Sequence, residues 1–170
     1  MMVKLFGACL VLVGCACVGW GMAAAQVREE NSLRTLLAIL ENMSCEMQYM
    51  HTPLPQLCRS AVVGFDCVVT NVFTDLAEEL EAQVLPNAEL CLQDTLEKHN
   101  NLPPYTVAAL RQLGGSLGKF DLNGQMKGIE LVMADCQRKL DALQCNKDSR
   151  LRSYRTLGIC AGVAMVIILL

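Results

Sequence analysis

Both ends of the chain are apolar, and the middle alternates between hydrophobic and polar positions. Residues 5–25 form a run of 21 residues without a charged side chain, and residues 156–170 form a second run of 15. A membrane-spanning helix needs ~20 consecutive apolar residues. The pattern therefore predicts an N-terminal transmembrane anchor at 1–26, a water-facing domain at 27–155 and a C-terminal hydrophobic or transmembrane segment at 156–170.

The second apolar run is short for a complete crossing. Fifteen helical residues rise only ~22 Å, whereas the hydrocarbon layer is ~30 Å thick. Arg155 can snorkel to the interface, or the segment can stop partway. Gly158 and Gly162 have the spacing of small residues that lets membrane helices approach closely, so we predict helix packing there.

The first apolar run has two alternative interpretations. Lys4 followed by an apolar stretch and the small residues 23–25 is also typical of a secretory signal peptide. Residues 12–15, ending at Cys15, resemble the cleavage site of a lipoprotein signal. The C-terminal apolar run favours an uncleaved anchor, because a secreted protein has no use for it.

The middle of the chain has helical periodicity throughout. Apolar side chains recur at intervals of three and four residues, as expected for amphipathic helices. In the first helix this stripe is Leu33, Leu36, Leu37, Leu40, Met43, Met47 and Met50. Helices are expected at about 27–51, 53–64, 66–83, 87–98 and 105–117, with a long one after Asp121. Alternation near Val68 also fits a strand, but the acidic run that follows favours helix.

Two positions set the expected helix boundaries. Proline disfavours helix in the residue before it, so the first helix should end near His51, with Thr52 capping the next helix and Pro53 as its first residue. Asp121 is placed to cap the last helix, whose expected stripe is Met126, Ile129, Met133, Cys136, Leu140 and Leu143. Six helices with short connections predict an all-α antiparallel bundle flanked by transmembrane helices.

Basic residues predict the orientation of the domain. Lys4 alone precedes the first apolar run, whereas the domain side of the two runs carries Arg28, Arg34, Lys147, Arg150, Arg152 and Arg155. The positive-inside rule therefore places the domain in the cytoplasm. There, reducing conditions disfavour disulfides, and the ten cysteines are interpreted as structural thiols.

Catalytic and ligand-binding patterns are weak. No CxxC pair occurs, and Gly114–Lys119 departs from the phosphate-binding loop at the flanking positions. The sequence therefore predicts a non-enzymatic protein without cofactor, metal, nucleic acid or small-molecule substrate. Residues 66–97 contain eight acids and no basic residue. This segment is either a solvated surface or a docking face for a basic partner.

Two short motifs resemble a known family. Residues 46–55 resemble the "E-x-x-Y-x-x-T-P-L" stretch of the stage III sporulation protein AB family, and residues 113–121 resemble its "G-x-x-L-G-x-x-D" stretch. Their order and the apolar ends also match, so the resemblance covers essentially the whole chain. The richness in cysteine departs from the family pattern, although no motif position is cysteine.

The resemblance implies a subunit of the transenvelope complex that joins mother cell and forespore during endospore formation. The family is similar to the inner-membrane platform proteins of type II secretion and type IV pilus systems, whose cytoplasmic domains are six-helix bundles. It implies a location in the mother-cell membrane around the forespore. It also implies two kinds of partner: the cytosolic secretion-type ATPase, stage III sporulation protein AA, and other membrane subunits.

The motif residues form two expected turns. Tyr49, His51, Thr52, Pro53 and Leu54 shape the turn between the first two helices. Gly114, Leu117, Gly118 and Asp121 shape the turn between the last two. Both sets are either determinants of the fold or a contact surface for a partner. The remaining alternative for the whole chain is a generic membrane-tethered helical adaptor or an extracytoplasmic lipoprotein, in which the cysteines can pair.

Overall fold

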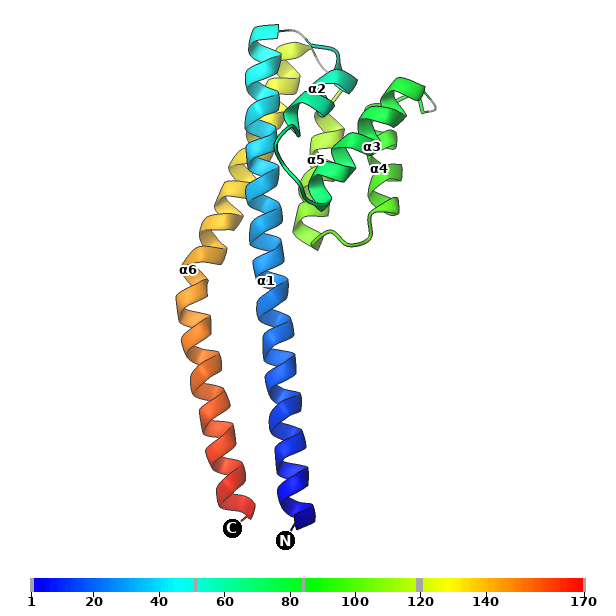
Figure 1. The fold of residues 1–170 in the computed structure, drawn as a ribbon. Coiled ribbons are helices and arrows are strands. Elements are labelled where there is room, and N and C mark those ends of the chain that lie inside the picture. The colour runs from blue at the N-terminus through cyan, green and yellow to red at the C-terminus, as the bar shows by residue number, and fades with distance from the viewer. Residues whose placement is uncertain (1, 51, 84, 119–120, 170) are drawn as a thin grey trace. The chain divides into compact units, whose positions relative to one another are not determined.

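The computed structural model describes the backbone of residues 2–50, 52–83, 85–118 and 121–169. Side chains are described for residues 24–50, 52–83, 85–118 and 121–145. All regular secondary structure in the described residues is helical, which confirms the all-α prediction. The helices are α1 (Met2–Met50), α2 (Leu54–Ala61), α3 (Val68–Ala82), α4 (Ala88–Lys98), α5 (Pro104–Ser116) and α6 (Leu122–Leu169) (Figure 1).

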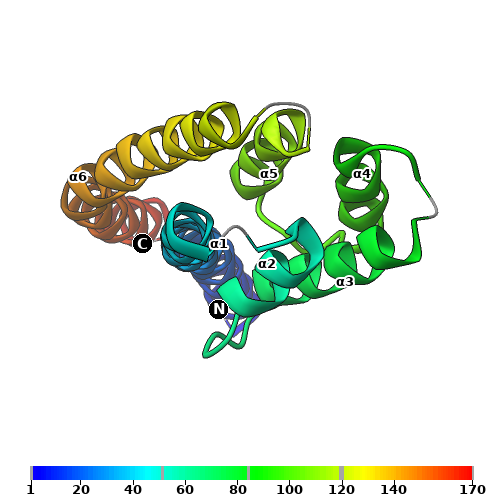
Figure 2. The same ribbon diagram turned by 90° about the horizontal axis from the view of Figure 1, so that it is seen from above.

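Residues 28–140 form one compact unit, and residues 1–27 and 141–170 form the other. Within the first unit, α2 packs on α3, α3 on α4, and α4 on α5. Viewed from above, successive helices of this unit lie beside one another, with α1 next to α2 and α6 next to α5 (Figure 2). The unit is therefore a helical bundle in which chain order and spatial order coincide.

Polar contacts join the outer helices to the bundle. Asn42 on α1 donates to the carbonyl of Ala61 at the end of α2, at 3.3 Å. On the other side, the Tyr105 hydroxyl of α5 donates to the Asp135 carboxylate of α6 at 2.5 Å, and Lys139 lies 4.8 Å from the centre of the Tyr105 ring. Burial, followed by the hydrogen bond to the Asp135 carboxylate, raises the pKa of Tyr105 to about 12, so its hydroxyl keeps its proton at physiological pH.

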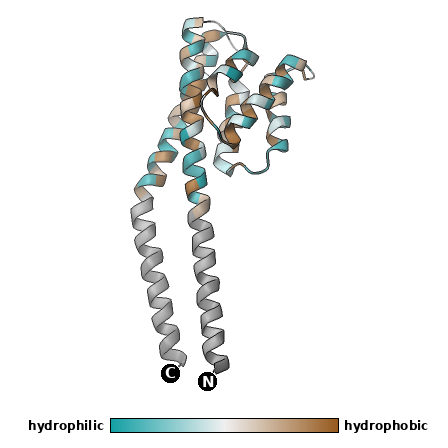
Figure 3. Ribbon diagram, viewed as in Figure 1, coloured by the Kyte–Doolittle hydropathy of each residue, from teal (hydrophilic) through white to brown (hydrophobic). Residues whose placement is uncertain are grey.

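The buried core contains most of the expected apolar stripes. On α1, five stripe residues are buried: Leu33, Leu36, Leu40, Met43 and Met47. Ile39 is buried although the predicted stripe omits it, and Met50 is 73% exposed although the stripe includes it. Met50 is the last residue of α1, where the chain leaves the bundle's inner face. Figure 3 shows hydrophobic and hydrophilic residues alternating along these helices.

The other helices also bury one apolar face, although some buried positions differ from the expected ones. Val63 falls within the second helix expected at 53–64 but is 75% exposed, because α2 ends at Ala61 and the chain turns there. Phe73 is fully buried on α3, and Val132 joins Ile129, Cys136 and Leu140 in the buried face of α6.

The starts of the first two helices also differ from the prediction. The first helix was expected to begin near Val27, but α1 begins at Met2 and continues without a break. No glycine or proline occurs between residues 22 and 50, so nothing local interrupts it. The cap of α2 is Pro53 rather than Thr52, and Leu54 is its first residue. Pro53 has extended geometry, with φ −57° and ψ 144°, which fits a residue preceding the helix.

Among the residues that the structure describes, none of the helices combines the length and hydropathy needed to cross a bilayer. The predicted anchors lie outside the described side chains, apart from residues 24–26 of the first. Gly158 and Gly162, predicted to pack membrane helices, also lie outside them.

Candidate functional site

The first motif surrounds the end of α1. Tyr49 is 78% exposed, Thr52 is half-buried and Pro53 is exposed. The carbonyl of Pro53 accepts a hydrogen bond from the backbone N–H of Leu57 at 2.9 Å, which closes the first turn of α2. Leu54 is half-buried at the start of that helix. His51 lies outside the described residues.

The second motif connects α5 to α6. The Leu117 N–H donates to the carbonyl of Leu113 at 3.1 Å and ends α5, and Gly118 then adopts a φ of +73°. Left-handed backbone of this kind favours glycine and commonly terminates helices. The Asp121 carboxylate accepts from the N–H of Gly124 at 3.1 Å, at the start of α6. This contact confirms the prediction that Asp121 caps the last helix.

Gly114 has a different role from Gly118. It is buried in the last turn of α5, facing α4. A Cβ atom there would lie 2.9 Å from Leu92 Cδ2 and 3.6 Å from Glu89 Cα. Gly114 therefore allows α4 and α5 to approach closely. Gly118 thus follows the end of α5, whereas Gly114 permits the close packing of α4 and α5.

The two motifs meet at one surface of the bundle, although about 60 residues separate them in the sequence. Thr52 and Leu54 from the first motif and Gly118 from the second line a common hollow of about 250 Å³. We call it the turn hollow, and its lining is Met47, Thr52, Leu54, Leu57, Gly118, Leu122 and Gln125. The exposed Tyr49 and Met50 belong to the same turn. This surface is a candidate contact site, because it combines apolar lining with exposed large side chains.

Gly118→Ala should destabilise the domain by about 1–2 kcal/mol, because the left-handed backbone costs an L-residue roughly that much. Space is not the cause, since an added Cβ would lie 3.5 Å from Ala88 Cβ, an ordinary contact distance. Gly118→Asn should cost less, because asparagine tolerates this conformation. Urea unfolding of the two variants measures the difference. Equal losses of stability in Gly118→Ala and Gly118→Asn would show that backbone strain is not the cause.

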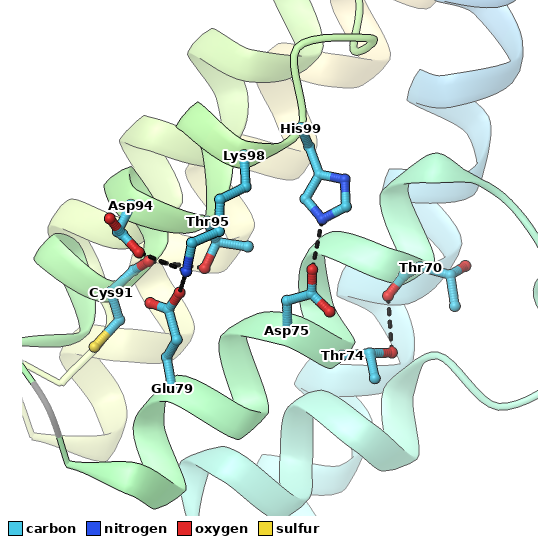
Figure 4. A network of polar contacts seen from close by, with 9 residues as sticks. All are labelled: Thr70, Thr74, Asp75, Glu79, Cys91, Asp94, Thr95, Lys98 and His99. Carbon is cyan, nitrogen blue, oxygen red and sulfur yellow. Dashed lines mark hydrogen bonds and ion pairs between the residues drawn. The ribbon is translucent and has the colours of Figure 1, made fainter.

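The acid-rich segment 66–97 is partly neutralised by basic residues just outside it. Lys98 contacts Glu79 at 2.6 Å and Asp94 at 2.7 Å, and His99 contacts Asp75 at 2.6 Å (Figure 4). Arg59 of α2 contacts Glu81 at 2.7 Å. The hydrogen bond from Lys98 lowers the pKa of Asp94 and keeps it ionised.

At least three of the eight acids therefore pair with lysine or arginine, and Asp75 contacts His99. Three of these contacts tie α3 to α2 or to the end of α4. The geometry favours the interpretation of this segment as a solvated, internally paired surface over a docking face for a basic partner.

The described cysteines behave as separate thiols rather than as a ligand cluster. Cys58, Cys91 and Cys136 are buried, whereas Cys45 and Cys145 are exposed. Burial raises the pKa of Cys58 to about 12 and that of Cys136 to about 11, so both remain protonated and unreactive at neutral pH. Within the described part of the chain, no group of acid, histidine and cysteine side chains could hold a metal ion.

Some residues of the turn hollow were not predicted as site residues. Met47 was expected only in the core stripe, and Leu122 and Gln125 were not singled out. A helical-wheel argument could have found the last two, because Leu122 and Gln125 are three residues apart at the start of α6 and so share a face.

Comparisons with known proteins agree with one another. Residues 4–170 match the family described as Stage III sporulation protein AB. Stage III sporulation protein AB of Bacillus subtilis (strain 168) is 25% identical over 173 residues, covering 99% of this chain and all of the relative. A solved structure of a stage III sporulation protein AB has a TM-score of 0.63 and 22% identity. It covers 72% of this chain and 98% of its own, so it supports the fold.

Proposed function

Because the chain belongs to the stage III sporulation protein AB family, we propose that it is a membrane platform subunit of the sporulation complex between mother cell and forespore. In this proposal it couples a cytosolic secretion-type ATPase, stage III sporulation protein AA, to the membrane channel. The matched family and relative are named as sporulation proteins rather than as enzymes, which supports a transmitting role rather than a catalytic one.

One observation carries the proposal of a partner surface. The two family-like motifs converge on the turn hollow from distant parts of the sequence. If they only shaped the fold, all of their large apolar side chains would be expected in the core. Leu117 of the second motif is buried, but Tyr49 is 78% exposed and Met50 is 73% exposed. Exposed tyrosine and methionine beside an apolar hollow are enriched at protein interfaces.

The direct test is binding of the full chain, in lipid nanodiscs, to purified stage III sporulation protein AA. We expect saturable binding that an excess of unlabelled chain competes away. Binding that is equal with empty nanodiscs would contradict the proposal. A second membrane subunit of the complex, added to the same assay, shows whether the chain can hold both partners at once.

The cytoplasmic placement of the domain predicts a pattern of thiol labelling. A maleimide that cannot cross membranes should leave Cys45 and Cys145 unlabelled in intact sporulating cells and label both after lysis, because both are exposed in the folded domain. Cys58 should label only after denaturation, because burial raises its pKa to about 12. Mass spectrometry of tryptic peptides gives the labelled fraction at each position.

Labelling of Cys45 in intact cells would contradict this placement and favour the extracytoplasmic lipoprotein. The matched control is the Cys45→Ser variant, which removes the signal of that position alone. Cys58 provides an internal control for unfolding, since its labelling before denaturation would mean that the domain has opened.

A further inference from the structure

A second hollow of the bundle differs in chemistry from the turn hollow. It has a volume of about 480 Å³, within the range of ~300–1,000 Å³ typical of ligand sites. Three segments contribute to it: Arg28, Asn31, Ser32 and Thr35 from α1, the start of α3, and the loop between α4 and α5 with Asn101. We call it the polar pocket. All of its contributors belong to the compact unit 28–140.

The charge of the polar pocket is positive. None of the described side chains that line it is acidic, although the chain as a whole has a net charge of −3. Arg28 supplies its one cationic side chain. The two acids next to Arg28 in the sequence point to other partners: Glu29 contacts Lys139 at 3.6 Å, and Glu30 contacts Arg34 at 2.9 Å.

In the described part of the chain, Arg28 itself has no ion pair. A guanidinium without a carboxylate partner, beside neutral amides and hydroxyls, can donate hydrogen bonds to an anion. Arginine forms bidentate hydrogen bonds with phosphate oxygens, and asparagine N–H and serine O–H groups add further donors. The pocket therefore fits a phosphate monoanion better than a cation or an apolar ligand.

The position of Arg28 in the sequence indicates the source of that phosphate. Arg28 follows the predicted membrane anchor, residues 1–26, by two residues. Successive Cα atoms are 3.80 Å apart, so Arg28 lies within about 8 Å of the end of the anchor whatever the arrangement of the two units. Basic residues this close to the end of a membrane-spanning segment attract anionic lipid headgroups.

We propose that the polar pocket binds the phosphodiester headgroup of an anionic phospholipid, with Arg28 as the principal contact. This inference rests on the membrane placement in the proposed function. It assigns the pocket a role distinct from the turn hollow: it seats the domain on an anionic leaflet, while the turn hollow contacts the protein partner.

The test uses the full chain purified in a neutral detergent and titrated with dihexanoyl phosphatidylglycerol, dihexanoyl phosphatidylcholine or inorganic phosphate. Native mass spectrometry measures the bound lipid. We expect phosphatidylglycerol to bind more tightly than phosphatidylcholine, with hydrogen-exchange protection at residues 28–35 and 99–103. Arg28→Gln should weaken phosphatidylglycerol binding roughly tenfold, the effect of one charge-assisted hydrogen bond.

Arg111→Gln is the matched control, because Arg111 is exposed on α5, does not line the pocket and carries the same charge. It should leave the affinity unchanged. Ser32→Leu fills the pocket without changing charge and should also weaken binding, with circular dichroism confirming that the variant is folded. Equal losses for Arg28→Gln and Arg111→Gln would show a non-specific charge effect and overturn the inference.

Two further outcomes separate this inference from the function on which it rests. Inorganic phosphate that binds as tightly as phosphatidylglycerol would identify a free anion as the ligand and overturn the lipid assignment. Vesicle partitioning resistant to sodium carbonate tests the membrane placement independently. If the chain partitions into vesicles but shows no headgroup preference, only the proposal of headgroup binding at the polar pocket is contradicted. If the chain does not partition into vesicles, the proposed function is contradicted.

Discussion

Leu54→Asp should weaken binding to the cytosolic ATPase roughly ten- to hundredfold while the domain stays folded. Burying a leucine side chain contributes about 1.5–3 kcal/mol, and each ~1.4 kcal/mol is a tenfold change in affinity. Leu54 lines the turn hollow and is only half-buried in the free chain, so a partner that fills the hollow would complete its burial. An aspartate there would bring an unpaired charge into the interface.

The position of Leu54 protects the fold from this substitution. Leu54 is the first residue of α2, where a negative side chain interacts favourably with the helix dipole. That gain of ~0.3–1 kcal/mol offsets part of the lost apolar burial. Circular dichroism and urea unfolding of the full chain measure the stability, and biolayer interferometry on the nanodisc-bound chain measures the affinity.

Leu90→Asp is the matched control for Leu54→Asp. Leu90 is in the first turn of α4, is 40% exposed and lines neither the turn hollow nor the polar pocket. The same chemical change at an equivalent helix position should therefore leave ATPase binding intact. A similar loss of binding in both variants, or unfolding of the Leu54 variant alone, would mean that the turn acts through the fold and not through contact.

Gly128→Ala should lower the free energy of unfolding by roughly 1–3 kcal/mol, because the added methyl group overpacks the interior. We expect it to be the most destabilising addition of a single methyl group in the described domain. A Cβ atom at Gly128 would lie 2.4 Å from Ser116 Cβ and 2.5 Å from Ser116 Oγ. Rotation of the serine hydroxyl does not move its Cβ, so α5 and α6 must separate. This loss of stability would exceed the gain of ~1 kcal/mol that alanine's higher helix propensity provides.

A second substitution at the contact partner tests that explanation. Ser116→Gly removes both close atoms and leaves Ser116 Cα at 3.8 Å, an ordinary contact. The double variant should therefore be more stable to urea than Gly128→Ala alone. Gly115→Ala is the control for alanine in α5, because nothing lies within 4 Å of an added Cβ there, and it should be neutral or slightly stabilising. Additive effects of Gly128→Ala and Ser116→Gly would contradict a direct clash.

The helical class and the helix faces could be predicted because periodicity encodes them locally. The spacing of Leu33, Leu36 and Leu40 identifies the buried face of α1, and all three are buried. Asp121 is recognisable as a cap because an aspartate just before a helix finds its partner, the N–H of Gly124, only three residues on. Such features depend on neighbours within one or two turns.

The features that could not be predicted depend on contacts between distant segments. Nothing near Gly128 in the sequence indicates that Ser116 lies against it, because glycine carries no side chain to reveal a partner. The acidic segment looked like a charged surface because its basic partners, Arg59 and Lys98, lie outside it in the sequence. The convergence of the two motifs on one hollow is likewise visible only in the folded structure.

The most direct test of the partner surface is site-specific photo-crosslinking in sporulating cells. A benzophenone amino acid at position 49 replaces a tyrosine that is 78% exposed, and the same probe at Leu131, which is 58% exposed on α6, is the control. We predict a crosslink between position 49 and stage III sporulation protein AA that is absent from position 131 and lost in the Leu54→Asp background. Crosslinking to the ATPase from position 131 but not from position 49 would contradict the account.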